Sequence, residues 1–303
     1  MTCGLRIDVC TYEGLRTGVP NLLRILDRHR IRASFFVALG PDRSGRAILQ
    51  AFRPGFLAKM RRTSAARAYG WRTVLSGTLL PARRMADLAD VMRAIVTEGH
   101  ELAAHGHDHR GWQDRLHRMS EQAVRRELTQ AIEVYQRVVG RRPRGFGAPG
   151  WQCSSASLRL LDELGFAYAS DARGRGPFFP RVGGRRLRTV QLPTTLPTLD
   201  EVLGLDGMDG AGFADLICER VERGAWDVFT MHAEMEGREF QWVADRILAR
   251  LRTRGILPLT LWEVREGILA DEEASILETE VLQRPIKGRA GEVAVPAGLE
   301  PVD

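Results

Sequence analysis

The stretch that decides the interpretation of the chain is Gly99-His100-Glu101-Leu102-Ala103-Ala104-His105-Gly106-His107-Asp108-His109. Three of the seven histidines fall within its last five residues, directly after an apolar run. Along an extended strand, alternation would place these three imidazoles on one face, whereas a turn would bring together only His105 and His109. Either arrangement predicts a divalent-metal site, because imidazole nitrogens are common ligands of such ions. The competing interpretation is a polar loop whose histidines bind nothing.

The composition indicates a large α/β protein of a reducing compartment. With 303 residues, 44% of them hydrophobic, the chain suits one barrel-sized domain or two smaller ones. It shows no secretory signal, no long apolar segment and no CxxC spacing, so we expect a cytoplasmic protein. The net charge of +6 comes almost wholly from arginine, since the only lysines are Lys59 and Lys287. Arginine richness suits phosphate or anionic-lipid partners.

On both sides of the histidine stretch, apolar strands alternate with amphipathic helices. Residues 4–10 predict a strand, residues 19–26 a helix with apolar residues at positions i, i+3, i+4 and i+7, and residues 33–39 a second, wholly apolar strand. The same alternation continues to about residue 260 and predicts seven or eight strands. Strand, helix, strand implies a parallel sheet, whose simplest closure is a barrel.

Residues 41–81 interrupt this alternation for far longer than the usual connection of about 4–6 residues. The segment carries eight basic residues against one acid, Asp42, and interleaves them with aromatic and aliphatic side chains. One interpretation is a helical excursion that packs its aromatic residues on the barrel. The other is a surface that lies on an anionic membrane or grips a lipid phosphate. Nucleic acid is a weaker alternative because no recognition motif is present. The basic residues are Arg43, Arg46, Arg53, Lys59, Arg61, Arg62, Arg67 and Arg72.

Polar residues follow several of the predicted strands. In a parallel barrel the carboxyl ends of the strands share one edge, so these residues are expected to meet in a single site. Two histidines and one anionic ligand would hold a divalent metal with a position open for water. Asp8 could then take a proton from the water while His232 protonates a leaving nitrogen, which describes amide hydrolysis. The residues at the predicted strand ends are Asp8, Cys10, His105, His109, Asp171 and His232.

The same residues lie in motifs that resemble the polysaccharide deacetylase (NodB homology) family over roughly residues 4–265. The central match is Gly99-His100-Glu101 followed by His105-x3-His109. The flanking matches are Leu5-Arg6-Ile7-Asp8-Val9, Arg16-Thr17-Gly18-Val19-Pro20, Gly40-Pro41-Asp42, Ser170-Asp171-x-Arg173-Gly174, Leu192-Pro193-Thr194-Thr195-Leu196-Pro197-Thr198 and His232-Ala233-Glu234-x-Glu236-Gly237.

This resemblance implies a metal-dependent deacylase built as a distorted (β/α) barrel of about seven parallel strands. We therefore expect the barrel over residues 1–268, with the basic insertion at about 41–81, and a flexible C-terminal tail over 269–303. Carried over residue by residue, the family's roles make Asp8 the catalytic base and His232 the acid. They also make His105 and His109 metal ligands.

The resemblance further implies substrate or orienting contacts for Asp171 and Arg173, and a substrate contact for Arg16. The most similar branch of the family removes a formyl group from a lipid-linked amino sugar in lipid A modification. The expected partner is therefore a lipid-phosphate-linked amino sugar, met at the cytoplasmic face of the inner membrane.

Cys10 departs from the family pattern, which has a second aspartate at this position. Residues 8 and 10 of a strand share a face, so the Cys10 thiol still points toward the predicted site. A thiolate ligand would favour zinc, with manganese or cobalt as alternatives. Other interpretations replace Cys10 by water or Glu13, or make it an apolar filler in an impaired protein. The arginine usual in the third motif is also absent, since Gly147 stands there.

Three functions are compatible with these residues and motifs. The first is metal-dependent hydrolysis of the formamide of a lipid-linked amino sugar, which yields formate and a free amine. The second is deacetylation of another N-acyl sugar by the same residues. The third is a catalytically impaired protein that binds a sugar lipid, suggested by Cys10.

Overall fold

The computed structural model describes residues 2–46, 76–221, 226–271, 275–289 and 291–301. Most of the predicted basic insertion, residues 47–75, lies outside these ranges, so its predicted contact with a membrane or a lipid phosphate is carried forward as a prediction. Among the helices described, none is both long and apolar enough to cross a bilayer.

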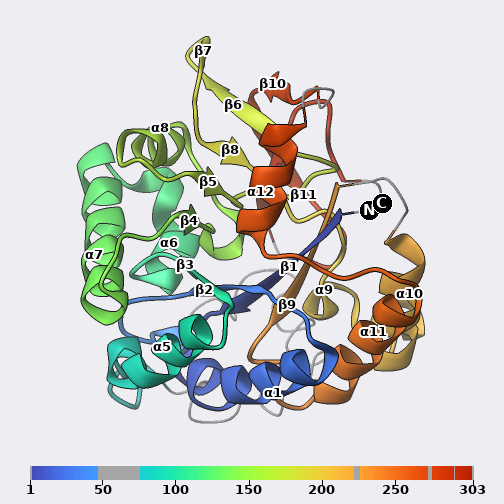
Figure 1. The fold of residues 1–303 in the computed structure, drawn as a ribbon. Coiled ribbons are helices and arrows are strands. Elements are labelled where there is room, and N and C mark those ends of the chain that lie inside the picture. The colour runs from blue at the N-terminus through green and yellow to red at the C-terminus, as the bar shows by residue number, and fades with distance from the viewer. Residues whose placement is uncertain (1, 47–75, 222–225, 272–274, 290, 302–303) are drawn as a thin grey trace.

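Seven parallel strands form the body of the sheet, as predicted, and lie in the order β9-β1-β2-β3-β4-β5-β8. The sheet curls into an incomplete barrel rather than a closed one, because the ordered path of described strands ends at β9 on one side and β10 on the other (Figure 1). The strands are β1 (Thr2–Val9), β2 (Ser34–Val37), β3 (Glu101–Ala104), β4 (Gly145–Phe146), β5 (Tyr168–Ala169), β8 (Val190–Gln191) and β9 (Trp226–His232).

Helices cover the outside of this sheet (Figure 1). They are α1 (Val19–His29), α5 (Ala89–Thr97), α7 (Glu121–Val139), α8 (Ser155–Glu163), α10 (Gly210–Arg220) and α11 (Gln241–Thr253). A further helix, α12 (Leu261–Ala270), packs on the start of β1, while α6 (His109–Arg115) and α9 (Leu199–Val202) follow the opposite ends of the strands. The described residues also form single turns at Gly14–Gly18, Met85–Leu88, Leu116–Arg118, Pro149–Trp151 and Leu205–Gly207.

The sequence sets the ends of these helices by local hydrogen bonding. The Ser120 hydroxyl accepts from the Ala123 N–H at the start of α7, and Gly140 ends the helix with a φ of 82°, a conformation that glycine adopts without strain. At α8, Ser154 and Ser157 form a reciprocal capping box. Both helices belong to the predicted alternation of strands and helices.

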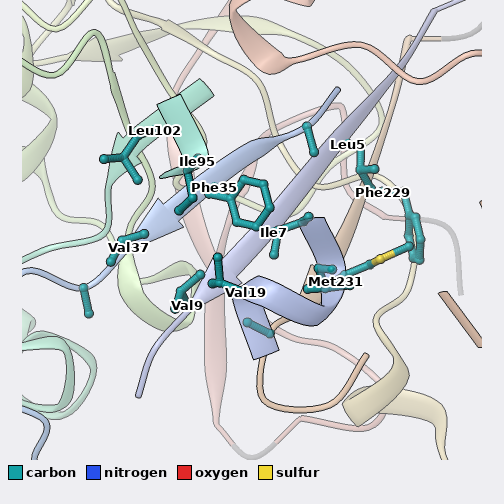
Figure 2. Packing of buried hydrophobic residues seen from close by; sticks show 14 of the residues in the cluster. Leu5, Ile7, Val9, Val19, Phe35, Val37, Ile95, Leu102, Phe229 and Met231 are labelled. Carbon is teal, nitrogen blue, oxygen red and sulfur yellow. The ribbon is translucent and has the colours of Figure 1, made fainter. Parts of the chain in front are cut away.

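Alternation along β1 separates the core from the site. Leu5, Ile7 and Val9 are fully buried and pack with Val19 of α1 and residues of β2 and β9 (Figure 2). Residues 6 and 8 therefore face the opposite way, into the barrel. Two charged residues at these positions have little access to solvent, so their partners must come from within the protein.

The prediction of a flexible tail over 269–303 is wrong for the described residues. β10 (Leu277–Thr279) joins β6 (Phe178–Val182), which also pairs with β7 (Arg185–Arg186), and β11 (Val281–Pro285) forms a hairpin with β12 (Glu292–Pro296). Val293 and Val295 are buried against Trp151. The prolines and glycines of this segment suggested a linker, whereas they flank a short strand whose apolar residues 293–295 are all buried.

We expect Val295→Asp to destabilise the protein by at least about 2 kcal/mol, because it places an unpaired charge in the buried apolar contact with Trp151. Glu292→Ala, on the exposed end of the same strand, should change the free energy of unfolding by less than about 0.5 kcal/mol. Denaturant unfolding followed by circular dichroism measures both. A flexible tail would make the two variants equally harmless.

Candidate metal centre and active site

Cys10, His105 and His109 come together at the carboxyl ends of the strands. One ligand atom from each lies within 4.8 Å of the others, and the Cys10 Sγ is 3.7 Å from the His105 Nε2. The His105 and His109 rings lie 4.9 Å apart, centroid to centroid. His107, between them in sequence, is not part of this group. Alternation on a strand would have brought all three histidines together, so the turn after β3 selects the pair four residues apart.

Hydrogen bonding fixes the orientation of His105. Its Nδ1 lies 2.7 Å from the Gly147 carbonyl oxygen, which can only accept, so Nδ1 carries the proton and the lone pair of Nε2 faces the cluster. Burial lowers the pKa of His105 to about 4 and holds the pKa of His109 well below its usual value. Both imidazoles are therefore neutral near pH 7, which is the form that binds a metal.

His109 is placed by the start of a helix. It is the first residue of α6, and the Asp108 carboxylate caps that helix by accepting from the Gly111 N–H at 2.9 Å. The other carboxylate oxygen of Asp108 accepts from Arg43 at 2.7 Å. Asp108 thus acts on the backbone beside His109 and not on the imidazole itself.

Cys10 is held through its backbone by Glu234. One oxygen of the Glu234 carboxylate accepts from the N–H groups of Cys10 and Thr11, each at 2.8 Å. Gly14 leaves room for this carboxylate, since a Cβ there would lie 2.1 Å from it. Burial, followed by the charges of Glu234 and Asp8, raises the pKa of the Cys10 thiol well above its usual value. The thiol keeps its proton unless a cation replaces it.

Glu13 and Arg16, both singled out in the sequence, form an ion pair at 2.7 Å next to this turn. Glu13 also pairs with Arg83 at 2.8 Å, so its carboxylate is bound by two arginines and is not part of the cluster. The Arg16 side chain is 53% exposed. Its predicted contact with a substrate stays a prediction.

Asp8 has a partner that the sequence pattern did not predict. Arg6 donates to both oxygens of the Asp8 carboxylate, from Nε at 2.6 Å and from Nη2 at 2.8 Å, and its Nη1 donates to the carbonyl and hydroxyl of Ser170. Burial alone would raise the pKa of Asp8, but the positive charge of Arg6 and its hydrogen bonds to the carboxylate outweigh burial and lower it. Asp8 is therefore an anion that lies 3.8 Å from the His105 Nε2.

Arg6 occupies the place opened by Gly147. A Cβ at Gly147 would lie 2.6 Å from the Phe36 ring and 3.1 Å from the Arg6 Nη2. Gly147 stands where the family's third motif usually has an arginine. In this chain Arg6 of β1 places a guanidinium next to that position. The sequence did contain a sign of this role, because Arg6 is a charged residue two positions before Asp8 in an otherwise apolar strand.

His232 lies directly beside Asp8, because β9 and β1 are parallel and these two residues are in register. The His232 Nδ1 has no hydrogen-bond partner among the described residues and lies 3.8 Å from an oxygen of Asp200. Glu236 accepts from the backbone N–H of His232 at 2.9 Å, and the rings of His232 and Trp151 form a T-shaped pair with centroids 6.2 Å apart. The predicted acid and base thus share one edge of the sheet.

Asp171 and Arg173 lie behind these residues and are buried. The Asp171 carboxylate accepts from Gln191 at 3.0 Å, and burial raises its pKa to about 7. The Arg173 guanidinium pairs with Glu201 and donates to the Leu196 carbonyl at 2.9 Å. Their bonds lie within the protein, which fits the orienting contacts predicted for them better than direct contact with a substrate.

The donor set fits a divalent metal. Bonds of about 2.0–2.3 Å place neighbouring ligands of tetrahedral zinc roughly 3.3–3.8 Å apart, the range in which the Cys10 Sγ and His105 Nε2 lie. The two neutral imidazoles and the thiol are donors that zinc accepts, and Asp8 adds a negative charge nearby. This residue set accounts for how a metal would be held.

Comparison with known proteins identifies the family of this chain. Residues 4–169 match the polysaccharide deacetylase family. A probable 4-deoxy-4-formamido-L-arabinose-phosphoundecaprenol deformylase (ArnD) of Shewanella sediminis is 36% identical over 95% of this chain and 92% of its own. A protein of the same description from Wigglesworthia glossinidia brevipalpis is 29% identical over 93% and 97%.

Among solved structures, a putative polysaccharide deacetylase from Mycobacterium smegmatis matches with a TM-score of 0.64 and 21% identity, over 94% of this chain and 95% of that one. This likeness confirms the fold of the sheet and its helices. Together with the sequence matches, it confirms the resemblance carried by the histidine motif: the chain belongs to the polysaccharide deacetylase family, whose members hydrolyse amide bonds.

Proposed function

We propose that the protein hydrolyses the formamide of a lipid-phosphate-linked amino sugar, as the names of its relatives describe, and releases formate and a free amine. One observation carries the chemistry. An anionic carboxylate, Asp8, and an imidazole, His232, flank a three-donor cluster on adjacent strands. That arrangement suits attack of water on an amide carbon.

In this proposal Asp8 acts as the base. Arg6 keeps its carboxylate ionised and fixed, and the carboxylate accepts the proton of the attacking water. His232 gives a proton to the leaving nitrogen, and the nearby Asp200 stabilises the positive charge that His232 carries before that transfer. The bond from carbon to nitrogen breaks, so one water and one formamide become formate and amine.

Cys10, His105 and His109 would hold the metal. A divalent ion there would supply Lewis-acid activation of the water and of the carbonyl. We propose zinc, because a thiolate with two imidazoles favours it over harder ions, with manganese or cobalt as alternatives. Glu234, which binds the backbone of Cys10, holds that ligand in place.

We also propose that the protein contacts an anionic membrane at the rim around residues 76–84, where the lipid of such a substrate is anchored. Leu79 is 81% exposed there, and Arg46, Arg83 and Arg84 lie on the same loops. An exposed leucine flanked by arginines suits an interface that is apolar below and anionic at its surface.

Purified wild type should release formate from a formamido sugar carried on a polyprenyl phosphate. We expect His105→Ala to abolish turnover and stoichiometric zinc, Cys10→Asp to retain or raise turnover, and Asp8→Asn to lower kcat by about 10²–10⁴-fold. His107→Ala is the matched control within the same motif and should retain activity. Acetate released from an N-acetyl substrate in place of formate would support a deacetylase instead. Wild type with no bound metal under reducing conditions would support an impaired binding protein.

Zinc affinity should fall about tenfold for each unit by which the pH is lowered, because the Cys10 thiol must lose its proton when the ion binds. In Cys10→Asp the ligand is already ionised, so this dependence should largely disappear. Competition with a chromophoric chelator at about pH 6 and about pH 8 measures both proteins. Equal slopes for the two would remove Cys10 from the ligand set.

Leu79→Glu should weaken binding to anionic vesicles by roughly tenfold. The change replaces an apolar side chain that would insert into the bilayer by a carboxylate, which the negative lipid headgroups repel. Leu257→Glu is the control, because Leu257 is 57% exposed next to the segment that pairs with the start of β1, at the opposite end of the strands. Vesicle co-sedimentation gives both affinities. If the two variants bind alike, this rim is not the membrane contact.

A further inference from the structure

Trp151 joins the active site to the C-terminal hairpin. Its buried indole forms a T-shaped pair with His232. It also lies near three guanidinium groups, with ring-to-Cζ distances of 5.5 Å for Arg6, 5.0 Å for Arg173 and 4.5 Å for Arg289. The residue has a φ of 52°, which a non-glycine residue adopts only when its surroundings hold it there. Val293 and Val295 of β12 pack on the same indole.

Arg289 reaches this place from the loop between β11 and β12. The loop lies directly against α9, since a Cβ at Gly288 would be 2.1 Å from the Glu201 carbonyl oxygen. The Arg289 side chain is 11% exposed, and its one hydrogen bond in the described structure is a long one, 3.5 Å from Nη1 to a Glu201 oxygen. Most of the donors of this guanidinium therefore have no acceptor among the described residues.

The same Glu201 oxygen already serves Arg173, and the other oxygen of Glu201 accepts from the Thr198 N–H at 3.0 Å. Two guanidinium groups thus share one carboxylate. The neighbouring acid, Asp200, accepts from the Thr198 hydroxyl at 2.6 Å, and the same oxygen lies 3.8 Å from the His232 Nδ1. Burial lowers the pKa of Arg173 and the positive charge of Arg289 lowers it further, whereas Glu201 opposes both.

We propose that Arg289, backed by the charge of Arg173, binds the phosphate of the substrate. An arginine with unused donors in a site of low exposure is suited to a phosphate, which it can bind through two parallel hydrogen bonds. The inference rests on the proposed function, in which one sugar ring separates the formamide from the phosphate. His232 and Arg289 both lie next to the same indole, so the formamide at His232 and the phosphate at Arg289 would be held within one sugar ring of each other.

The experiment compares two soluble substrates that carry the same formamido sugar. One is a phosphodiester to a short isoprenyl chain, and the other is the uncharged methyl glycoside. Arg289→Gln should lower kcat/KM for the phosphodiester relative to the glycoside by about 10–100-fold, mainly through KM, which is the effect of losing one charge-assisted contact. Arg289→Lys should restore part of this ratio. Lys287→Gln is the matched control, because Lys287 lies two residues away and pairs with Asp206 at the surface.

An equal loss of kcat/KM on both substrates would overturn the proposal, since it would show that Arg289 only supports Trp151. A lowered melting temperature of Arg289→Gln with an unchanged substrate ratio would do the same. Binding of inorganic phosphate, measured by calorimetry, separates this inference from the proposed function. If wild type hydrolyses neither substrate, the proposed function fails. Phosphate binding that Arg289→Gln loses and Lys287→Gln keeps would still support the subsite, and equal binding by all three would refute it.

Discussion

Arg6 and Asp8 form their ion pair inside the barrel, where their side chains are 0% and 4% exposed. A buried charge left without its partner costs about 3–5 kcal/mol, so the two residues constrain each other strongly. They lie on the same face of one strand, and Arg6 extends the pair to Ser170 after β5 and stacks near Phe36 and Trp151. The pair therefore fixes an anion at the centre of the site and links the strands and the loop that surround it.

Much of the fold follows from periodicity. Alternating apolar strands and amphipathic helices predict a parallel sheet, and parallel strands bring their carboxyl ends together, which is why Asp8, Cys10, His105 and His232 meet. Arg6 was missed because a lone arginine in an apolar strand gains meaning only when the register shows what it faces. The hairpin over residues 281–296 was missed because its strands are short and its prolines and glycines resemble those of a linker. Near residue 260, where the predicted alternation ends, the structure has only an isolated bridge between Leu259 and Gly4.

Cys10 shows how one substitution can alter a site without moving it. The backbone of this residue is bound by Glu234 whatever side chain it carries, so a thiol and a carboxylate would point to the same place. Their chemistry differs in hardness and in the pH at which each becomes an anion. In the proposed metal site, this position would therefore influence which ion is held and how firmly.

The hairpin that packs on Trp151 also bonds to the loops on either side of the site, through the Arg173 N–H to the Ala294 carbonyl at 2.9 Å and the Gln152 amide to the Glu292 carbonyl at 2.6 Å. A ribosome makes these residues after the strands they support, because synthesis runs from the N-terminus to the C-terminus. The barrel strands emerge while the indole still lacks its cover. The surroundings of His232 are therefore complete only when the last thirty or so residues of the chain, which include this hairpin, have been made and packed on Trp151.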